Sequence, residues 1–243
     1  MSFIEQIKQR AKQEIKTIVL PEATDVRILE AAEMIKNEGY AKVILIGNEE
    51  EVRKLAKERN IDIGETKIID PAVSIETARY SKELYELRKS KGMTEEQAEK
   101  LVLEPVYFGM MMVKLNEADG LVSGAAHSTS DTLRPALQIL KTAPGTKLVS
   151  AFFVMVVPNC KYGENGTFIF ADSGLNEEPD SEKLSEIAIS SSKSFEQLVG
   201  TQPKVAMLSY SSHGSAHSEL TEKVIEATKL LKEKEPNLIA DGE

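Results

Sequence analysis

The feature that most constrains the fold is the regular alternation of short β-rich runs with helical stretches. Thr17–Leu20, Lys42–Ile46, Lys67–Asp70 and Gly120–Ser123 are short runs of the kind that form strands, and helical patterns separate them. Parallel neighbouring strands need such crossover helices, whereas antiparallel neighbours can be joined by a tight turn. The pattern therefore predicts βαβ units and a mostly parallel sheet that is covered on both faces.

The helical stretches can be placed from their apolar spacing and their end signals. Asp25 is suited to cap a helix that stops at Gly39. The remaining helices in this part of the chain are predicted to begin near Phe3 and to lie at Glu49–Arg59, Ile75–Lys89, Thr94–Val102, Pro105–Asn116 and Ala136–Leu140.

The best candidate for a domain boundary is Thr142–Thr146, because it contains Pro144 and Gly145. A chain of 243 residues exceeds one average domain and is short for two full ones, and the boundary divides it into a first domain at 1–145 and a second at 146–243. In the second part, strands are predicted at Leu148–Val157, Thr167–Ala171 and Lys204–Ser209, and helices at Ser181–Leu198 and Ser218–Lys232, with a final apolar run at Leu238–Ala240. The polar turn between the first two strands predicts a hairpin.

Composition excludes several classes of protein. Thirty Lys and Arg against 39 Asp and Glu give a net charge of −9, which argues against nucleic acid and anionic membranes as partners. The single Cys160 excludes an intramolecular disulfide framework and a multi-cysteine zinc site, and three histidines leave little for a metal centre. The N-terminus lacks a signal-peptide pattern and the longest apolar run is Ala151–Pro158, so we expect a cytoplasmic protein.

The segment Ala118–Pro135 is the most informative about chemistry. A buried strand runs into Gly124 and then into small and hydroxylated residues before a helix begins. In a parallel α/β sheet such a loop lies at the carboxyl end of its strand, where ligands bind. Ser128 and Thr129 supply hydroxyl groups, amides at a helix start favour an anion, and Arg134 can hold a phosphate or carboxylate in a bidentate manner.

A purely structural role is the alternative for this segment. Ser128, Thr129 or Asp131 can cap a helix that takes Pro135 in its first turn, and the spacing fits neither the Walker loop nor the dinucleotide fingerprint. Both interpretations can hold together. The Ser-rich loop Tyr210–Ala216 and the turn Pro21–Asp25 have the same strand-to-helix form, but caps explain them adequately.

Taken together, these segments resemble the phosphate acetyl/butyryltransferase family, and specifically its acetyl branch. The likeness covers the whole chain in the family's order. The stretches that carry it are Val19–Arg27, Ala118–Gly145, Phe170–Asn176 with Pro179, Ile187–Ala188, and Met207–Ser211 with Gly214–Ala216. Two departures are His213, where a lysine is common, and Ser173, where a cysteine is expected.

The resemblance implies the reversible reaction acetyl-CoA + phosphate ⇌ CoA + acetyl phosphate, with CoA as substrate and without a cofactor or a metal. It implies two α/β domains like those of the isocitrate/isopropylmalate dehydrogenases, a site in the cleft between them, and a homodimer. In the family, an aspartate takes the proton of the CoA thiol, and the thiolate attacks acetyl phosphate directly in a ternary complex. A serine and arginines stabilise the charge of the tetrahedral transition state.

The family's functional residues carry over only in part. Arg88 and Arg134 match arginines linked with CoA or acyl-phosphate binding, and Ser128 and Thr129 match the polar loop that lines the phosphate pocket. The same loop makes Ser123, Gly124 and His127 further candidates for substrate binding. No catalytic residue is assigned, because the resemblance implies that the family's Ser-Arg pair and aspartate lie beyond Glu243. It therefore implies a C-terminally truncated chain with an incomplete second domain and little activity.

Two alternatives to acetyl transfer stay open at this point. Phosphate butyryltransferase is one, because a methylene is worth only ~1–3 kcal/mol of discrimination and the linear sequence does not show the pocket. The other is a non-catalytic domain that senses CoA or acetyl phosphate, as in malic-enzyme fusions. The roles of Cys160 and His213 are left unassigned.

Overall fold

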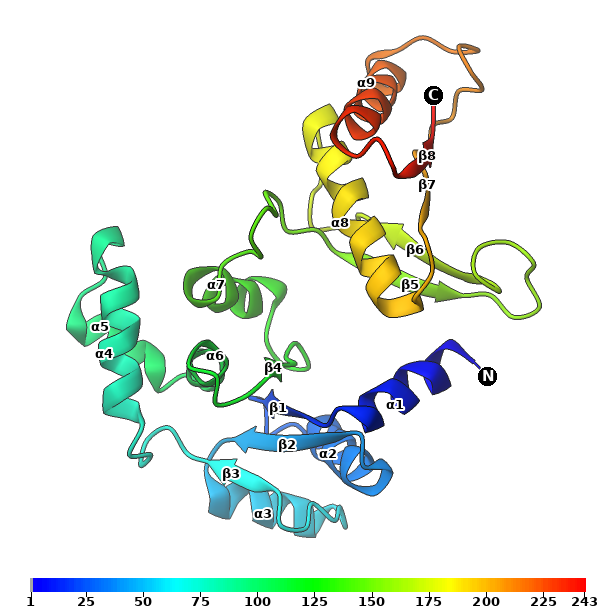
Figure 1. Ribbon diagram of the computed structural model, residues 1–243. Coiled ribbons are helices and arrows are strands. Elements are labelled where there is room, and N and C mark those ends of the chain that lie inside the picture. The colour runs from blue at the N-terminus through cyan, green and yellow to red at the C-terminus, as the bar shows by residue number, and fades with distance from the viewer. Residues whose placement is uncertain (1) are drawn as a thin grey trace. The chain divides into compact units, whose positions relative to one another are not determined.

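In the N-terminal part, the side chains of the strands point alternately to the two faces of a sheet, and a separate set of helices covers each face. The structure, a computed structural model, describes residues 2–243 (Figure 1). The contacts between its residues divide it into two compact units, Ile4–Lys141 and one that takes in Thr142–Glu243, and each is described by itself.

The first unit holds a four-stranded sheet in the order β3-β2-β1-β4, and all of its pairs are parallel. Its strands are β1 (Lys16–Leu20), β2 (Ala41–Ile46), β3 (Lys67–Ile69) and β4 (Gly120–Leu121). Its helices are α1 (Phe3–Gln13), α2 (Val26–Glu38), α3 (Glu49–Glu58), α4 (Thr77–Arg88), the 3-10 turn η1 (Lys89–Lys91), α5 (Glu95–Val102), α6 (Pro105–Lys114) and α7 (Thr129–Ile139). The chain builds outward from β1 to β3 and then crosses back to place β4 on the other side of β1.

The period-2 geometry of the strands explains the two layers. Val19, Ile44 and Ile46 pack in one core with α4–α7, whereas Leu20 and Leu45, which point the opposite way, pack in a second core with α2 and α3. One face of α6 lies so close to the sheet that a Cβ on Gly109 would come within 2.9 Å of Val19 and 2.6 Å of Leu121. The central strands are therefore buried on both faces, as expected for a parallel sheet.

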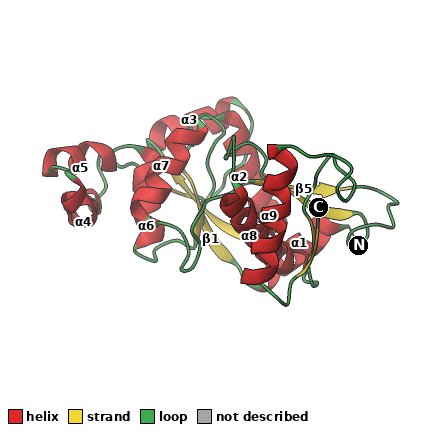
Figure 2. Cartoon of the chain, turned by 90° about the horizontal axis from the view of Figure 1, so that it is seen from above, coloured by secondary structure: helices red, strands yellow, loops and turns green. Residues whose placement is uncertain are grey.

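The second unit combines a hairpin, two long helices and a short parallel pair. Strands β5 (Phe152–Val156) and β6 (Thr167–Ala171) are antiparallel, which confirms the expected hairpin, and β7 (Lys204–Ala206) pairs with β8 (Ile239–Asp241) in parallel. Helices α8 (Ser181–Val199) and α9 (Glu219–Lys234) lie side by side (Figures 1 and 2) and enclose a small core around Ala227 and Leu231. The expected α/β fold with mostly parallel strands is confirmed.

Two predicted boundaries were wrong for identifiable reasons. Helix α7 begins at Thr129 and not at Ala136, because Ser128 caps it by accepting the Asp131 amide at 3.2 Å. Strand β5 begins at Phe152 and not at Leu148, because the Asp172 carboxylate takes the Ala151 amide at 3.2 Å in place of a ladder partner.

No helix among the described residues is long and apolar enough to cross a membrane.

Candidate functional site

The candidate site lies at the carboxyl ends of β1 and β4, where the order of the strands in the sheet reverses. Strands β1 and β4 are neighbours, with Val19 opposite Leu121, but the chain leaves them toward different sides of the sheet. The loops that follow their carboxyl ends therefore diverge at a switch point, which is where open α/β sheets bind ligands. These loops are the Pro21–Asp25 turn after β1 and residues 122–128 after β4.

The buried side chain of Glu22 organises the loop after β4. Its carboxylate accepts hydrogen bonds from four consecutive backbone amides: Gly124 and Ala125 at 2.9 Å, and Ala126 and His127 at 2.8 Å. Only 4% of the residue is exposed. Burial alone raises the pKa of Glu22, but the hydrogen bonds from Ala126, Ala125 and His127 outweigh burial and hold the pKa at about 2. This carboxylate is therefore ionised at neutral pH.

Glu22 changes what the loop can offer to a ligand. The amides of Gly124 and His127 already have an internal anion, so a substrate phosphate cannot use them without displacing Glu22. Gly124 still permits a close approach, because its φ of +117° favours glycine and nothing lies within 4 Å of the position of a Cβ. Sequence reasoning missed the role of Glu22, although its place directly after a buried strand was a usable signal.

Arg27, at the start of α2, also holds the loop after β4. Its guanidinium donates to the Ala125 carbonyl oxygen and pairs with Asp25 at 2.6 Å. The β1–α2 turn thus holds both the amides and a carbonyl of the loop after β4. This gives Arg27 a structural role.

The ring of His127 is oriented by Glu22. Its Nδ1 atom lies 2.8 Å from Glu22 Oε1, and an ionised carboxylate can only accept, so Nδ1 carries the proton. The opposite nitrogen, Nε2, has no hydrogen-bond partner within residues 2–243, and the side chain is 32% exposed. His127 is thus held by a buried anion while its second nitrogen is free.

Helix α7 begins immediately after this histidine. Ser128 is the N-cap, so its hydroxyl is engaged with the Asp131 amide and carboxylate, as the structural alternative required. Thr129 begins the helix and is exposed, and its hydroxyl has no partner in the described chain. The side chain of Ser123, just after β4, has a buried hydroxyl that also lacks a partner.

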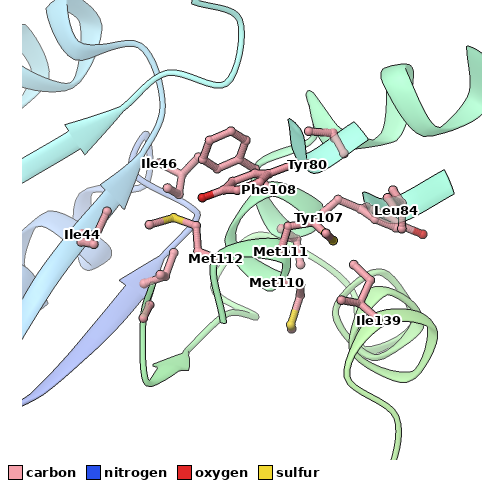
Figure 3. Close-up of a cluster of buried hydrophobic side chains, with 14 of the residues drawn as sticks. Ile44, Ile46, Tyr80, Leu84, Tyr107, Phe108, Met110, Met111, Met112 and Ile139 are labelled. Atoms are coloured by element: carbon pink, nitrogen blue, oxygen red, sulfur yellow. The ribbon is translucent and has the colours of Figure 1, made fainter. Parts of the chain in front are cut away.

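The charges of the two predicted arginines both act on Tyr107. Tyr107, on α6, belongs to the cluster of buried side chains in Figure 3 and is 9% exposed. Its hydroxyl donates a hydrogen bond to Gln138 Oε1 at 3.0 Å. Burial raises the pKa of Tyr107, and the charges of Arg134 and Arg88 oppose that rise. Gln138 lies one helical turn after Arg134 on α7, and Arg88 ends α4.

Neither arginine has an acidic partner within residues 2–243. Arg27, Arg53 and Arg79, by contrast, all form ion pairs. The Nε atom of Arg88 is moreover buried without a hydrogen-bond acceptor. Arg88 and Arg134 are therefore candidates for holding an anion in a chain of charge −9.

In the second unit, a carboxylate of this chain binds backbone amides of the loop after β7, as Glu22 does in the loop after β4. The Glu243 carboxylate accepts from the His213 amide at 3.0 Å, the Gly214 amide at 2.5 Å and the Ser211 hydroxyl. These interactions lower the pKa of Glu243, with the Gly214 bond as the largest cause. The Ser-rich loop is therefore held by a side chain of this chain.

A third carboxylate, Asp172, organises the turn after β6. It accepts from the amides of Gly174 and Leu175 at 2.8 and 2.7 Å and from the Asn176 side chain at 2.7 Å. Burial raises the pKa of Asp172, but these bonds outweigh it and hold that pKa well below its usual range. Cys160 is a partly exposed free thiol in the turn after β5.

The residues described here include no group of three or more His, Cys, Asp or Glu that could hold a metal ion. A hollow of about 550 Å³ lies beside α3 and is lined by residues such as Arg53 and Asp62. None of the predicted site residues lines it.

Comparison with known proteins shows which family this chain resembles. The family described as phosphate acetyl/butaryl transferase matches residues 2–243. A phosphate acetyltransferase of Acetivibrio thermocellus is 65% identical over 243 residues, which is all of this chain and 73% of that protein.

Solved structures agree with this match. EutD phosphotransacetylase from Staphylococcus aureus is 43% identical with a TM-score of 0.88, covering 99% of this chain and 72% of that one. A phosphotransacetylase from Streptococcus pyogenes is 37% identical with a TM-score of 0.90, covering 100% and 73%.

Proposed function

The chain belongs to the phosphate acetyl/butaryl transferase family, and from this premise we propose that it serves the reaction acetyl-CoA + phosphate ⇌ CoA + acetyl phosphate. Three relatives that are 65%, 49% and 48% identical are each named phosphate acetyltransferase. These names support acetyl transfer over the butyryl alternative. The substrates are CoA, acetyl phosphate and phosphate, and the thiolate of CoA attacks the acetyl carbonyl directly in a ternary complex.

The observation that carries the proposal in this structure is that neither Arg88 nor Arg134 forms an ion pair within residues 2–243, while the charges of both act on the same side chain, Tyr107. CoA and acetyl phosphate are both anions, and a guanidinium holds phosphate oxygens through two parallel hydrogen bonds. In a chain of charge −9, these two cations give the positive potential that an anionic substrate needs. Arg88 and Arg134 therefore bind substrate phosphate groups.

The loop after β4 completes the proposed binding surface. Ser123 and Thr129 offer hydroxyl groups, and Gly124 leaves room for a close backbone approach. Ser128 contributes by starting α7, whose first amides favour a phosphate, and His127 presents its Nε2 atom.

Calorimetric titration of the chain with CoA and with acetyl phosphate tests this assignment, and absorbance of the thioester bond reports acetyl transfer. Losing one charged hydrogen-bonding group costs about 1.5–3 kcal/mol, so Arg134→Gln and Arg88→Gln should each weaken CoA binding roughly tenfold or more. Arg53→Gln is the matched control, because Arg53 is an exposed arginine paired with Glu49. Absence of CoA binding, or an equal loss in the control, would contradict the proposal.

A homodimer is part of the proposal, and the hairpin supports it. Phe153 lies opposite Phe170 on one face of β5 and β6, and the two residues are 59% and 57% exposed. Apolar groups gathered on one face in this way are typical of protein interfaces. Sedimentation should show a dimer that Phe153→Glu dissociates, while the control Val73→Glu, at an exposed apolar residue of the other unit, leaves it intact. A chain that is monomeric before substitution would refute this part.

A cytoplasmic location is also proposed. Its support is the single free Cys160, a thiol suited to a reducing compartment. Fractionation of cells that express the tagged chain tests this, and recovery outside the cytoplasm would contradict it.

A further inference from the structure

We propose that Glu22 is a positioning residue for His127, holding the imidazole so that Nε2 contacts the phosphate group of the substrate. Imidazolium then makes this contact and neutral imidazole does not. The inference rests on the proposed function for the identity of the ligand. It adds a positioning residue and a charge state that the family match does not supply.

The first step is the direction of the ring. Nδ1 is 2.8 Å from a carboxylate that is almost fully buried, so this nitrogen faces the interior. The two ring nitrogens lie on opposite sides of the imidazole, and Nε2 therefore faces away from Glu22. No residue in the range 2–243 satisfies Nε2, and the side chain is 32% exposed.

The second step is that the backbone beneath the ring is held as firmly as the ring. The same carboxylate binds the His127 amide at 2.8 Å and the three amides before it. Arg27 holds the Ala125 carbonyl, and the next residue, Ser128, is fixed as the cap of α7. His127 thus loses little conformational freedom when a ligand arrives, which is what preorganised binding groups require.

The third step is charge. Neutral imidazole with its proton on Nδ1 presents a lone pair at Nε2, which repels a phosphate oxygen. Imidazolium presents an N–H donor and a positive charge, which attract that oxygen. Histidine is the side chain that switches between these forms from about pH 5 to 8.

The charged groups around the ring have both signs. Glu22 after β1 and Asp131 on the first turn of α7 are the carboxylates near the ring. Arg134 on α7 and Arg27 on α2 are cations of the neighbouring elements, and Asp25 is paired with Arg27. Because only imidazolium offers an N–H donor at Nε2, we expect phosphate to bind more tightly where the imidazole is protonated.

The decisive variant is His127→Asn. The Asn side-chain amide can replace Nδ1–H as the donor to Glu22, so the loop keeps its anchor, but nothing replaces Nε2. The probes are inorganic phosphate and acetyl phosphate, titrated by calorimetry from about pH 5.5 to 8.5, the range in which imidazole changes charge. The ratio of wild-type to variant affinity cancels the titration of the ligand itself.

The wild type should bind phosphate about tenfold more tightly than His127→Asn near pH 5.5, as expected for one charged hydrogen bond, with a ratio near one at about pH 8.5. The matched control is His217→Asn, an exposed histidine of the other unit, whose ratio should stay near one throughout. A ratio for His127→Asn that does not change with pH would overturn the proposal.

A second measurement reports the positioning by Glu22 directly. The ¹⁵N shifts of His127 in the wild type should show a proton on Nδ1 and none on Nε2 at high pH, and Glu22→Gln should mix the two tautomers. An Nε2–H tautomer in the wild type refutes the positioning role.

If the His127 tests fail while CoA still binds in an Arg134-dependent way, only this inference falls. If CoA and phosphate both fail to bind the wild type, the proposed function falls as well.

Discussion

Replacing Glu22 by glutamine should remove about 3 kcal/mol of stability at pH 7. The gap between the folded pKa of about 2 and the ordinary 4.5 corresponds to ~3 kcal/mol, at ~1.36 kcal/mol for each unit of pKa. Because the folded pKa is lowered, this stabilisation is complete above about pH 5 and is lost as the pH falls toward 2.

The hydrogen bonds that Glu22→Gln removes give a loss of stability of the same size. Oε2 accepts the amides of Gly124 and Ala125, and Oε1 accepts those of Ala126 and His127. A glutamine amide can satisfy only one of these pairs, and its NH₂ group then faces two N–H donors. Bonds to a charged group contribute about 1.5–3 kcal/mol each, so the loss of two accounts for the expected change.

Urea unfolding followed by circular dichroism measures the effect, since the chain has no tryptophan to serve as a fluorescence probe. The difference between wild type and Glu22→Gln should shrink to about half of its neutral value near pH 3, because the unfolded carboxyl group is then largely protonated while the folded one is still mostly ionised. Glu30→Gln, at an exposed position on α2, is the matched control and should cost less than about 0.5 kcal/mol. A Glu22→Gln cost below about 1 kcal/mol, or one that does not change with pH, would refute the reasoning.

Three further predictions follow from buried contacts. Gly109→Ala should destabilise the chain by about 1–2 kcal/mol despite its better helix propensity, because the new Cβ meets Val19 and Leu121; an unchanged melting temperature would count against this. Asp172→Asn should lower stability by about 2 kcal/mol at pH 7 and by less near pH 3, and urea titrations that show no pH dependence would contradict it. Tyr107→Phe should cost about 1 kcal/mol and weaken CoA binding, and calorimetry with unchanged CoA affinity would separate Tyr107 from the arginine site.

Much of the secondary structure follows from local patterns. The strands around Val19 and Leu45 were predicted because short apolar runs bounded by turns report burial on both faces. The start of α7 was not predicted correctly, because residues 129–134 lack apolar periodicity and only the Ser128 cap reveals the helix there. Strand β5 was placed too early, because Asp172, about 20 residues away in the chain, takes the Ala151 amide.

In the candidate site, too, some features follow from the sequence and others depend on the tertiary structure. That the loop after β4 lies at the carboxyl edge of a parallel sheet follows from chain order alone. That its amides are already occupied does not, since Glu22 lies 102 residues before Gly124 and no local pattern joins them. That the charges of Arg88 and Arg134 act on the same side chain, Tyr107, likewise depends on the packing of α4, α6 and α7.

By itself, the sequence determined the α/β class, the order of the elements, the loops that carry polar chemistry and the family. These properties are set by short-range periodicity and by motifs that are readable in a linear chain. Only the tertiary structure decided which donors are already used and which are free. A hydrogen bond between residues distant in sequence depends on the three-dimensional path of the backbone, and the Glu22 carboxylate, which leaves one nitrogen of His127 free, is such a case.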